Sequence, residues 1–552
     1  MKKIIIDPVT RVEGHLRVEV QLNENNIIEE AYVSGQLFRG IETILKNRDP
    51  RDAGLLAGRI CGVCTNSHFR TAVSCVEDAY SIEIPDNARS VRDLISLALF
   101  IQDHVVHFYH LHSLDYVDVT QALQADAEAC SKTTYKYSTD PFRNSKAHYE
   151  NVKQKLKSFV DSGRLGPFAN GYWGHSAYKL SAEENLILLS HYLDALKFQS
   201  SISKAIAIFG GKTPHPQSIV VGGITSVADI LNPSRLNEFI FILKEAKEFV
   251  DRAYLPDMKL LTAAYRDEIK AAQGRGNGNF IAVGGYEFSD SKLFESGVIT
   301  DHDFNNIQEF EAEKIKEYVE RAWYSEEDPE TPYYTDLNTN GSLKTEKNSD
   351  KYSWIKAPRY ENKTMECGPL ARILITYSRN NALLKPYVDN FLEETDLELI
   401  DLSTTVGRNA ARAIETQYIA DLLFKRVSDL LQHIKYYDTQ TWAQYDFNTL
   451  SKEADGNAFF EVPRGILSHF IEIKDQKIAH YSVIAPTTWN ATPKNRDGVR
   501  GAYEEALIGI KLEDPEKPLE VLKVLHSFDP CLACAVHVIN AKEKKLNRYK
   551  IT

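Results

Sequence analysis

Two Cys-X-X-Cys pairs, one near each end of the chain, constrain the fold more than any other feature of the sequence. The pairs are Cys61 with Cys64 and Cys531 with Cys534. Two cysteines at this spacing can turn both sulfur atoms toward one metal ion, and Gly62 eases the tight turn within the first pair. If the two pairs share one site, the ends of the chain must meet. That arrangement predicts one intertwined domain rather than a string of modules.

The spacing of the pairs does not choose the metal. Either pair alone is also typical of a redox dithiol or of half a structural zinc site. Structural zinc usually lies in a small loop-rich module whose ligands are close in sequence, whereas both pairs here lie in ordinary globular sequence. Soft thiolates suit nickel and iron as well. Cys75, Cys130 and Cys367 stand alone, and we interpret them as small buried hydrophobic residues.

Composition excludes several classes of protein. A net charge of -12 over 552 residues argues against nucleic acid as a partner, because phosphate binding needs a clustered basic surface. Seven cysteines are too few for a disulfide scaffold. No stretch reaches the roughly 18 consecutive apolar residues of a membrane helix. Asp7 and Pro8 come too early for the apolar region of a signal peptide, so we expect that export, if it occurs, depends on another protein.

The pattern of apolar residues predicts a mainly α fold with small β elements near both termini. Period-two alternation predicts strands at 4–6 and 15–22 and a second hairpin over 470–481. Apolar residues at three- and four-residue spacing predict helices over 87–117, 182–209, 233–264 and 383–435. The last range is too long for one helix, and Gly407 is its expected boundary. The polar segment 325–350 is typical of a surface excursion.

Two other patterns could suggest a metal site or a phosphate site, but we favour a structural interpretation of each. Four histidines lie close together in one predicted helix, namely His104, His107, His110 and His112. Because that helix is rich in Val, Phe, Tyr and Leu, packed or hydrogen-bonded histidines are favoured over a metal cluster. The glycine-rich run 274–279 neither follows a strand nor leads into a Gly-Lys-Ser/Thr sequence, so we interpret it as a loop and not a phosphate site.

Several motifs in a fixed order now give a specific resemblance. They are Arg11-Val12-Glu13-Gly14-His15, Phe38-Arg39-Gly40-Ile41-Glu42, Arg48-Asp49-Pro50-Arg51-Asp52-Ala53, Arg59-Ile60-Cys61-Gly62-Val63-Cys64 with His68, Gly210-Gly211-Lys212-Thr213-Pro214-His215-Pro216, Ala485-Pro486-Thr487-Thr488-Trp489-Asn490, and Asp529-Pro530-Cys531 with Cys534 and His537. Together they resemble the large subunit of nickel–iron hydrogenases over essentially the whole chain. The resemblance implies that family's fold and reversible heterolytic cleavage of H2 to protons and electrons, in a hydrogen-uptake role.

The resemblance also assigns the metal ligands. Cys61 and Cys531 would be terminal ligands of nickel, while Cys64 and Cys534 would bridge nickel to iron. The iron would carry one carbon monoxide and two cyanide ligands. Glu42, His537 and the main-chain carbonyl near Val483 would hold a second metal, magnesium in this family. A carboxylate, a carbonyl and waters suit a hard ion, although imidazole is a less usual ligand for magnesium.

Further side chains receive roles from the same resemblance. Glu13 would take a proton from Cys531, a role that suits a partly buried carboxylate; by pattern alone it could equally be a surface carboxylate. Arg464 would lie over the open face of the nickel, oriented by Asp103 and Asp529. The remaining three would complete the surroundings: Pro463 as part of that canopy, Thr487 as a donor to cyanide, and His68 as a donor to a bridging sulfur.

The resemblance implies partners as well. Three isolated cysteines cannot build a relay of iron–sulfur clusters, so a small subunit must supply it, with a membrane cytochrome b beyond. Residues 1–537 would form the catalytic domain, and a maturation endopeptidase would remove the tail 538–552 after nickel-insertion proteins have acted. The expected location is the periplasmic face of the cytoplasmic membrane, by export with the small subunit; the alternative is cytoplasmic.

Two alternative functions remain at this point. A related subunit of a quinone-reducing complex shares the fold but lacks both cysteine pairs. A zinc-stabilised interaction protein would keep the cysteines but has no need for Glu13, Arg464 and Asp103.

Overall fold

The computed structural model describes residues 2–138, 140–163, 166, 168, 171–287, 291–323 and 350–535. The predicted surface excursion 325–350 and the tail 538–552 therefore lie almost wholly outside the described residues. Among the described residues, no helix is both long and apolar enough to cross a membrane.

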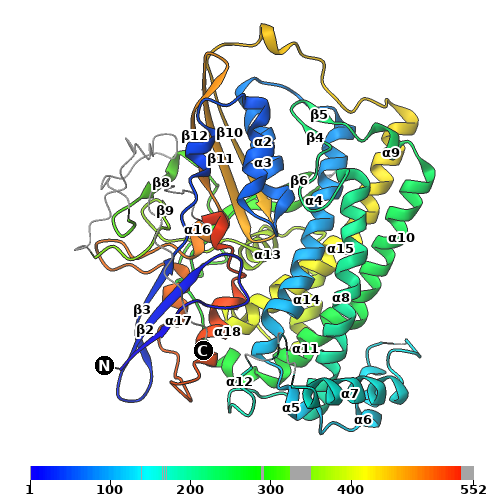
Figure 1. Cartoon of the computed structure of the whole chain (residues 1–552), viewed down its shortest axis with the longest axis vertical. Helices are drawn as coiled ribbons and strands as arrows, with labels where there is room; N and C mark the ends of the chain where they lie inside the picture. Colours follow the sequence, from blue (N-terminus) through cyan, green and yellow to red (C-terminus); the bar gives the residue numbers. More distant parts are fainter. Residues whose placement is uncertain are drawn as a thin grey trace.

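Four long helices form the body of the molecule and run side by side in Figure 1. They are α4 (Asp86–Val106), α8 (Ala182–Gly210), α10 (Pro233–Phe249) and α15 (Thr405–Tyr436). Residues at the ends of a helix determine where it starts and stops, as α8 illustrates. Ser181 and Glu184 form a capping box at the start of α8, and Gly211 ends that helix in the left-handed conformation. Helix α4 packs against both α8 and α15, and the side chains between them belong to the largest hydrophobic core.

The helix predictions hold with one correction. Helix α4 continues as a π-helical segment over His107–His112, and α10 continues through Val250–Tyr254 into α11 (Leu255–Ala264). The range 383–435 is broken as expected, into α14 (Lys385–Thr395) and α15. Gly407 is not the boundary. It lies inside α15, where an added Cβ would come 2.3 Å from the carbonyl oxygen of Asp401, so this glycine permits a close approach.

Two antiparallel three-stranded sheets confirm the β elements predicted near the termini. The first has the order β1 (Lys2–Ile6), β2 (Leu16–Leu22), β3 (Ile28–Gly35). The second has the order β10 (Ala454–Val462), β11 (Gly465–Lys474), β12 (Lys477–Ile484). Buried and half-buried residues alternate along β2, as its period-two sequence requires.

Shorter elements connect these layers. The helices are α1 (Ile41–Leu45), α2 (Ala53–Ala57), α3 (Thr65–Ala79), α5 (Val119–Ala122), α6 (Ala127–Thr134), α7 (Lys146–Asp161), α9 (Val227–Ile230), α12 (Arg266–Lys270), α13 (Pro369–Ser378), α16 (Pro486–Asn490), α17 (Ala502–Leu507), α18 (Leu519–Ser527) and α19 (Leu532–Ala535). The two-stranded sheets pair β4 (Ile219–Val220) with β5 (Gly223–Ile224), β6 (Phe280–Glu287) with β7 (Lys292–Ile299), and β8 (Ile315–Tyr318) with β9 (Ala357–Tyr360). These two-stranded sheets were not predicted from the sequence. The glycine-rich run 274–279 is a loop, as predicted.

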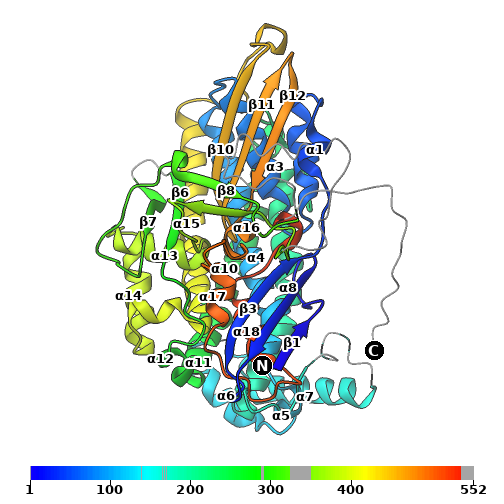
Figure 2. The same ribbon diagram turned by 90° about the vertical axis from the view of Figure 1, so that its left-hand side faces the viewer.

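The two ends of the chain pack against each other. The sheet β1–β3 shares a hydrophobic core with α17 and α18, and both views place these elements together (Figures 1 and 2). In the connection between β1 and β2, Glu13 forms a parallel backbone bridge with Cys531. The main chain of one terminus therefore lies against the cysteine pair of the other.

Candidate metal centre

Four buried thiols converge where the two ends meet. Cys61 follows a 3-10 turn after α2, Cys64 is the residue before α3, and Cys531 and Cys534 lie at the start of α19. The Sγ atoms of Cys61 and Cys531 are 3.4 Å apart, and those of Cys64 and Cys534 are 3.3 Å apart. All four sulfur atoms lie within 4.8 Å of one another, and none is in a disulfide. The expectation that both pairs share one site is thus correct.

The first pair is shaped by its backbone more than by its glycine. The N–H groups of Val63 and Cys64 donate to the Sγ of Cys61 at 3.3 and 3.2 Å. An added Cβ at Gly62 would meet no atom within 4 Å, and the residue does not have a positive φ. Neither the space around Gly62 nor its φ therefore requires glycine at this position.

The donor set fits a thiolate-held metal centre. Although burial opposes it, hydrogen bonds from Cys531, Cys534 and Cys64 lower the pKa of Cys61 well below its usual value. Burial raises the pKa of Cys531 and Cys534 well above theirs. Four thiolates so close together repel one another unless a cation lies between them, and a soft transition metal supplies that charge.

A single arginine joins the two cysteine segments. Arg39, from the Phe38-Arg39-Gly40 motif, donates to the carbonyl oxygen of Ile60 and, at 2.7 Å, to that of Ala533. Its position holds the turn before Cys61 against the short helix α19, which contains Cys534. Sequence analysis placed Arg39 in a motif but gave it no role.

Glu13 lies against the second pair. Its Oε2 atom is 3.2 Å from the Sγ of Cys531 and accepts a hydrogen bond from the N–H of Ala533 at 2.9 Å. Its own main chain continues the contact, since the N–H of Leu532 donates to the carbonyl of Glu13 at 2.8 Å. Burial, followed by the charge of Cys61, raises the pKa of this carboxyl group.

Arg464 is held at the tip of a two-residue hairpin turn between β10 and β11. Its guanidinium lies 3.3 Å from a carboxylate oxygen of Asp103 and 2.9 Å from one of Asp529, and its Nε donates to the carbonyl of Asp529 at 3.1 Å. Burial raises the pKa of Asp103 to about 8. The predicted grouping of these three residues is present, although Asp103 is on α4, far away in sequence.

The other predicted neighbours occupy defined positions. The hydroxyl of Thr487 accepts from the N–H of Cys531 at 3.0 Å, and the ring Nδ1 of His68 lies 3.0 Å from Nε2 of His469. The carbonyl of Pro463 accepts from Arg372 at 3.0 Å.

The predicted second metal site is described in part. A carboxylate oxygen of Glu42 accepts from the N–H of Val483 at 2.8 Å, and its other oxygen lies 3.7 Å from Nζ of Lys356. Lys356 also bonds Glu317 at 3.1 Å, and all these side chains are buried. His537 lies outside the described residues. Sequence analysis missed Lys356 and Glu317, which no motif marks.

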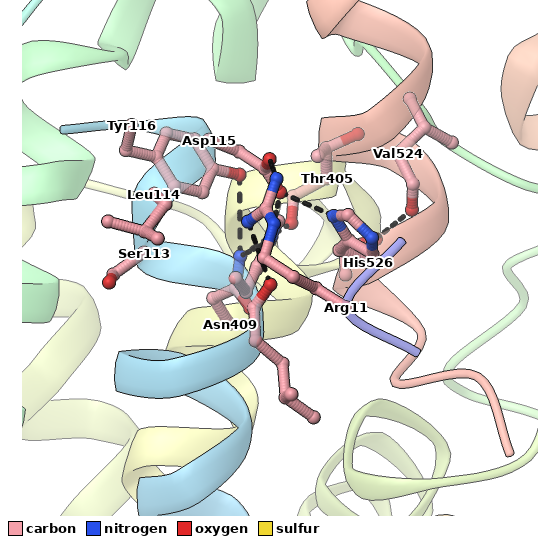
Figure 3. A network of polar contacts seen from close by, with 12 residues as sticks. Arg11, Ser113, Leu114, Asp115, Tyr116, Thr405, Asn409, Val524 and His526 are labelled. Atoms are coloured by element: carbon pink, nitrogen blue, oxygen red, sulfur yellow. Dashed lines mark hydrogen bonds and ion pairs between the residues drawn. The ribbon is translucent and has the colours of Figure 1, made fainter. Parts of the chain in front are cut away.

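A second buried group, which we call the Asp115 cluster, also gathers potential metal ligands: His112, Asp115 and His526, with their ligand atoms within 4.8 Å of one another. Figure 3 shows Arg11 and His526 pointing toward Asp115. One oxygen of Asp115 bonds Arg11 at 2.5 Å, and the other lies 2.8 Å from His112 and 2.6 Å from His526. Despite burial, Arg11 and the histidines hold the pKa of Asp115 well below its usual value.

Hydrogen bonds already use the ligand atoms of the Asp115 cluster. Both ring nitrogens of His526 face oxygen atoms, with Nε2 lying 2.9 Å from the carbonyl of Thr10 and Nδ1 lying 2.6 Å from Asp115. The Nε2 of His112 accepts from Asn409 at 2.9 Å. The cluster is a network of ion pairs and hydrogen bonds, and His112 within it is hydrogen-bonded, as predicted for the histidines of this helix. His104 likewise bonds Glu415, and His107 bonds the carbonyl of His526.

Comparisons with known proteins agree with this geometry. The family model described as nickel-dependent hydrogenase matches residues 39–537, and one described as HoxL-like matches residues 3–34. The quinone-reactive Ni/Fe-hydrogenase large chain of Wolinella succinogenes is 42% identical over 100% of this chain and 98% of its own length. The uptake hydrogenase large subunit of Rhizobium leguminosarum bv. viciae is also 42% identical, over 100% and 97%. The Ni-Fe-Se hydrogenase from D. vulgaris Hildenborough has a TM-score of 0.79 and 33% identity, covering 97% of this chain and 100% of that one.

The fold and the four converging thiols together define a class of large subunit that is built around a buried thiol site. The chain belongs to the nickel-dependent hydrogenase family, and it is the catalytic large subunit of a nickel–iron hydrogenase, an oxidoreductase that acts on hydrogen. The two cysteine pairs argue against the related quinone-reducing subunit, which lacks them.

Proposed function

We propose that this subunit works in hydrogen uptake, with its nickel–iron centre held by Cys61, Cys64, Cys531 and Cys534. The observation that supports this assignment is the convergence of four buried free thiols from opposite ends of the chain. Cys61 and Cys531 are the proposed terminal nickel ligands, and Cys64 and Cys534 the bridging ones. When bound, the centre supplies the redox chemistry that splits H2, with one carbon monoxide and two cyanides on iron.

The side chains around the thiols have separate tasks in this proposal. Glu13 receives a proton from the Sγ of Cys531 across their 3.2 Å contact and passes it outward. Arg464 presents a fixed positive charge to the reacting face, while Asp103 and Asp529 keep its planar guanidinium in one orientation. Such an orientation matters because electrostatic stabilisation depends on groups that do not need to reorganise during the reaction.

Three further groups complete the proposed surroundings of the centre. Thr487 accepts from the N–H of Cys531, which leaves its own hydroxyl hydrogen to donate to a cyanide. His68 is the proposed donor to a bridging sulfur, and Pro463 forms the apolar part of the canopy. Glu42, the carbonyl of Val483 and His537 are the proposed ligands of magnesium.

The remaining proposals concern assembly. Residues 1–537 act as one intertwined unit, and an endopeptidase removes 538–552 after nickel insertion. The three other cysteines, Cys75, Cys130 and Cys367, are too few for one four-cysteine cluster, so the electrons pass to an iron–sulfur small subunit. A membrane cytochrome b lies beyond it, at the periplasmic face of the cytoplasmic membrane.

Nickel content tests the proposed ligands. The Cys531→Ser variant should lose nickel and hydrogen oxidation, while Cys130→Ser, which alters another buried cysteine on α6, should retain both. In the unaltered protein, infrared spectra should contain bands of iron-bound carbon monoxide and cyanide. Zinc without nickel, and without these bands, would contradict the assignment. Hydrogen-driven dye reduction that is slower than hydrogen production would contradict the uptake role.

A further inference from the structure

A buried arginine outside every quoted motif holds the turn that carries Arg464. Arg372 lies on α13 and has no solvent exposure. Its Nε and one terminal nitrogen bond the two oxygens of Glu415 at 2.8 and 2.7 Å. Its other terminal nitrogen bonds Glu461 at 2.8 Å.

The remaining two N–H groups of Arg372 point at the turn itself. They donate to the carbonyl oxygens of Val462 at 2.9 Å and Pro463 at 3.0 Å. Val462 pairs with Gly465, so Pro463 and Arg464 are the two residues of the turn. All five N–H donors of one guanidinium are therefore used, and two of them fix the peptide planes immediately before Arg464.

Two aromatic rings also pack close to the Arg372 guanidinium. Its guanidinium carbon lies 5.1 Å from the ring centroid of Phe100 and 5.2 Å from that of Phe294. The far side of the turn is equally tight, because an added Cβ at Gly465 would come 2.5 Å from the Sγ of Cys367. The turn is thus fixed from both sides, by hydrogen bonds from Arg372 and by contact with Cys367.

We propose that Arg372 is a positioning residue for Arg464: its five hydrogen bonds fix the Pro463–Arg464 turn so that the Arg464 guanidinium points at the thiol site. Arg372 itself does not touch the four thiols in this proposal. It acts through the carbonyl groups of Val462 and Pro463. A small rotation of either peptide plane would redirect the Arg464 side chain. The inference rests on the role proposed for Arg464.

Lysine is the informative substitution at this position. It keeps the buried positive charge that Glu415 and Glu461 require, but its three donors radiate from one point and cannot serve two carboxylates and two carbonyls together. Arg372→Lys should therefore lower kcat by about tenfold, the scale of a misplacement of less than an ångström. It should also shift or broaden the infrared bands of the iron-bound cyanides, with nickel content retained.

The chain offers a matched control in Arg92. This buried arginine bonds both oxygens of Glu77 and the carbonyls of Val220 and Gly223, which flank another two-residue turn. It lies on α4, eleven residues before Asp103, which is about 16 Å along the helix. Arg92→Lys removes the same kinds of hydrogen bonds and should leave both kcat and the cyanide bands unchanged.

A double-mutant cycle separates positioning from general stability. If Arg372 acts through Arg464, adding Arg372→Lys to Arg464→Lys should cause no further loss of kcat. An equal loss in both backgrounds overturns the proposal, and so does an Arg372→Lys enzyme with normal kcat and normal cyanide bands. If Arg372→Lys fails to fold, Glu461→Gln weakens the same anchor with less disruption, and the same outcomes apply to it.

The cycle also distinguishes this inference from the proposed function. Unchanged hydrogen oxidation in Arg464→Lys overturns the role of Arg464, and with it this inference. Impaired oxidation in Arg464→Lys with no effect of Arg372→Lys overturns this inference alone.

Discussion

The thiol site and the Asp115 cluster are alike in several respects and differ in how their charge is balanced. Both are buried, both bring together potential metal ligands from distant parts of the chain, and both tie the segment around Arg11–Glu13 to the segment around His526–Cys531. In the Asp115 cluster, Arg11 and the two histidine rings surround the carboxylate, and hydrogen bonds use the ligand atoms. In the thiol site the sulfur atoms face one another, and a metal would supply the charge that four ionised thiols need.

The comparison teaches that proximity of ligand-type residues does not define a metal site. Both carboxylate oxygens of Asp115 already have donors within the protein, whereas the thiols have mainly each other. A site built for a metal is a set of ligands that the protein alone leaves unsatisfied. Variants at the two sites can distinguish a catalytic group at the thiol site, by its effect on turnover, from structural groups elsewhere, by their effect on stability.

Glu13→Gln should have the largest effect on activity. The amide cannot accept and release the proton of Cys531, so turnover should fall by about 10²- to 10⁴-fold, the usual contribution of a positioned acid or base. Nickel and iron should remain bound. Measurement of hydrogen oxidation against metal content checks this. Glu504→Gln, which alters a different buried glutamate, is the control and should leave turnover unchanged. Normal turnover in Glu13→Gln would remove Glu13 from the proton path.

Asp115→Asn should affect stability instead of chemistry. Removing the buried charge leaves Arg11 and His526 without their counter-ion, which should lower the free energy of unfolding by about 3–5 kcal/mol. Denaturant unfolding measures the change, and nickel per folded molecule should stay the same. Asp396→Asn breaks an exposed pair with Arg266 and should cost no more than about 1 kcal/mol. Loss of nickel at normal stability would show that the Asp115 cluster serves the metal centre.

Acid should weaken the fold through its buried histidines. Burial lowers the pKa of His104 and His112 to about 4, whereas an unfolded histidine titrates near pH 6.5. The unfolded state therefore binds more protons below pH 6.5, and the free energy of unfolding should fall by about 2 kcal/mol for each histidine between pH 6.5 and 5. Thermal unfolding at several pH values measures this. His112→Asn should remove part of the pH dependence, and an unchanged slope would contradict the assignment.

Gly62→Ala should have the smallest effect, although it lies between two proposed metal ligands. The backbone conformation is open to any residue and the space is free, so the free energy of unfolding should change by less than about 1 kcal/mol. Nickel content should be unchanged. A large loss of nickel would mean that the metal-bound loop needs a conformation that only glycine adopts.

Much of the architecture followed from local sequence. The long helices were predicted because three- and four-residue apolar spacing survives in any fold that buries one face of a helix. The hairpin 470–481 was predicted because its strands alternate and its turn is polar. The short central hairpins escaped prediction, since β4 and β5 have two residues each and carry no periodic signal. The helix boundary predicted at Gly407 was wrong because a glycine that ends a helix and one that permits close packing look the same in sequence.

The sequence by itself determined which residues carry the chemistry: two cysteine pairs, Glu13, Arg464, and the ordered motifs that relate the chain to its family. Only the tertiary structure decided which residues support them. Arg372 with Glu415 and Glu461, and Asp115 with His526, are pairings between segments far apart in the chain. Buried ion pairs of this kind follow no periodicity, because the partner of each charge is chosen by how helices and turns pack. The physical reason is that a motif shows which residue types the site needs. The orientation of their side chains depends on contacts with distant segments, and no local pattern shows these contacts.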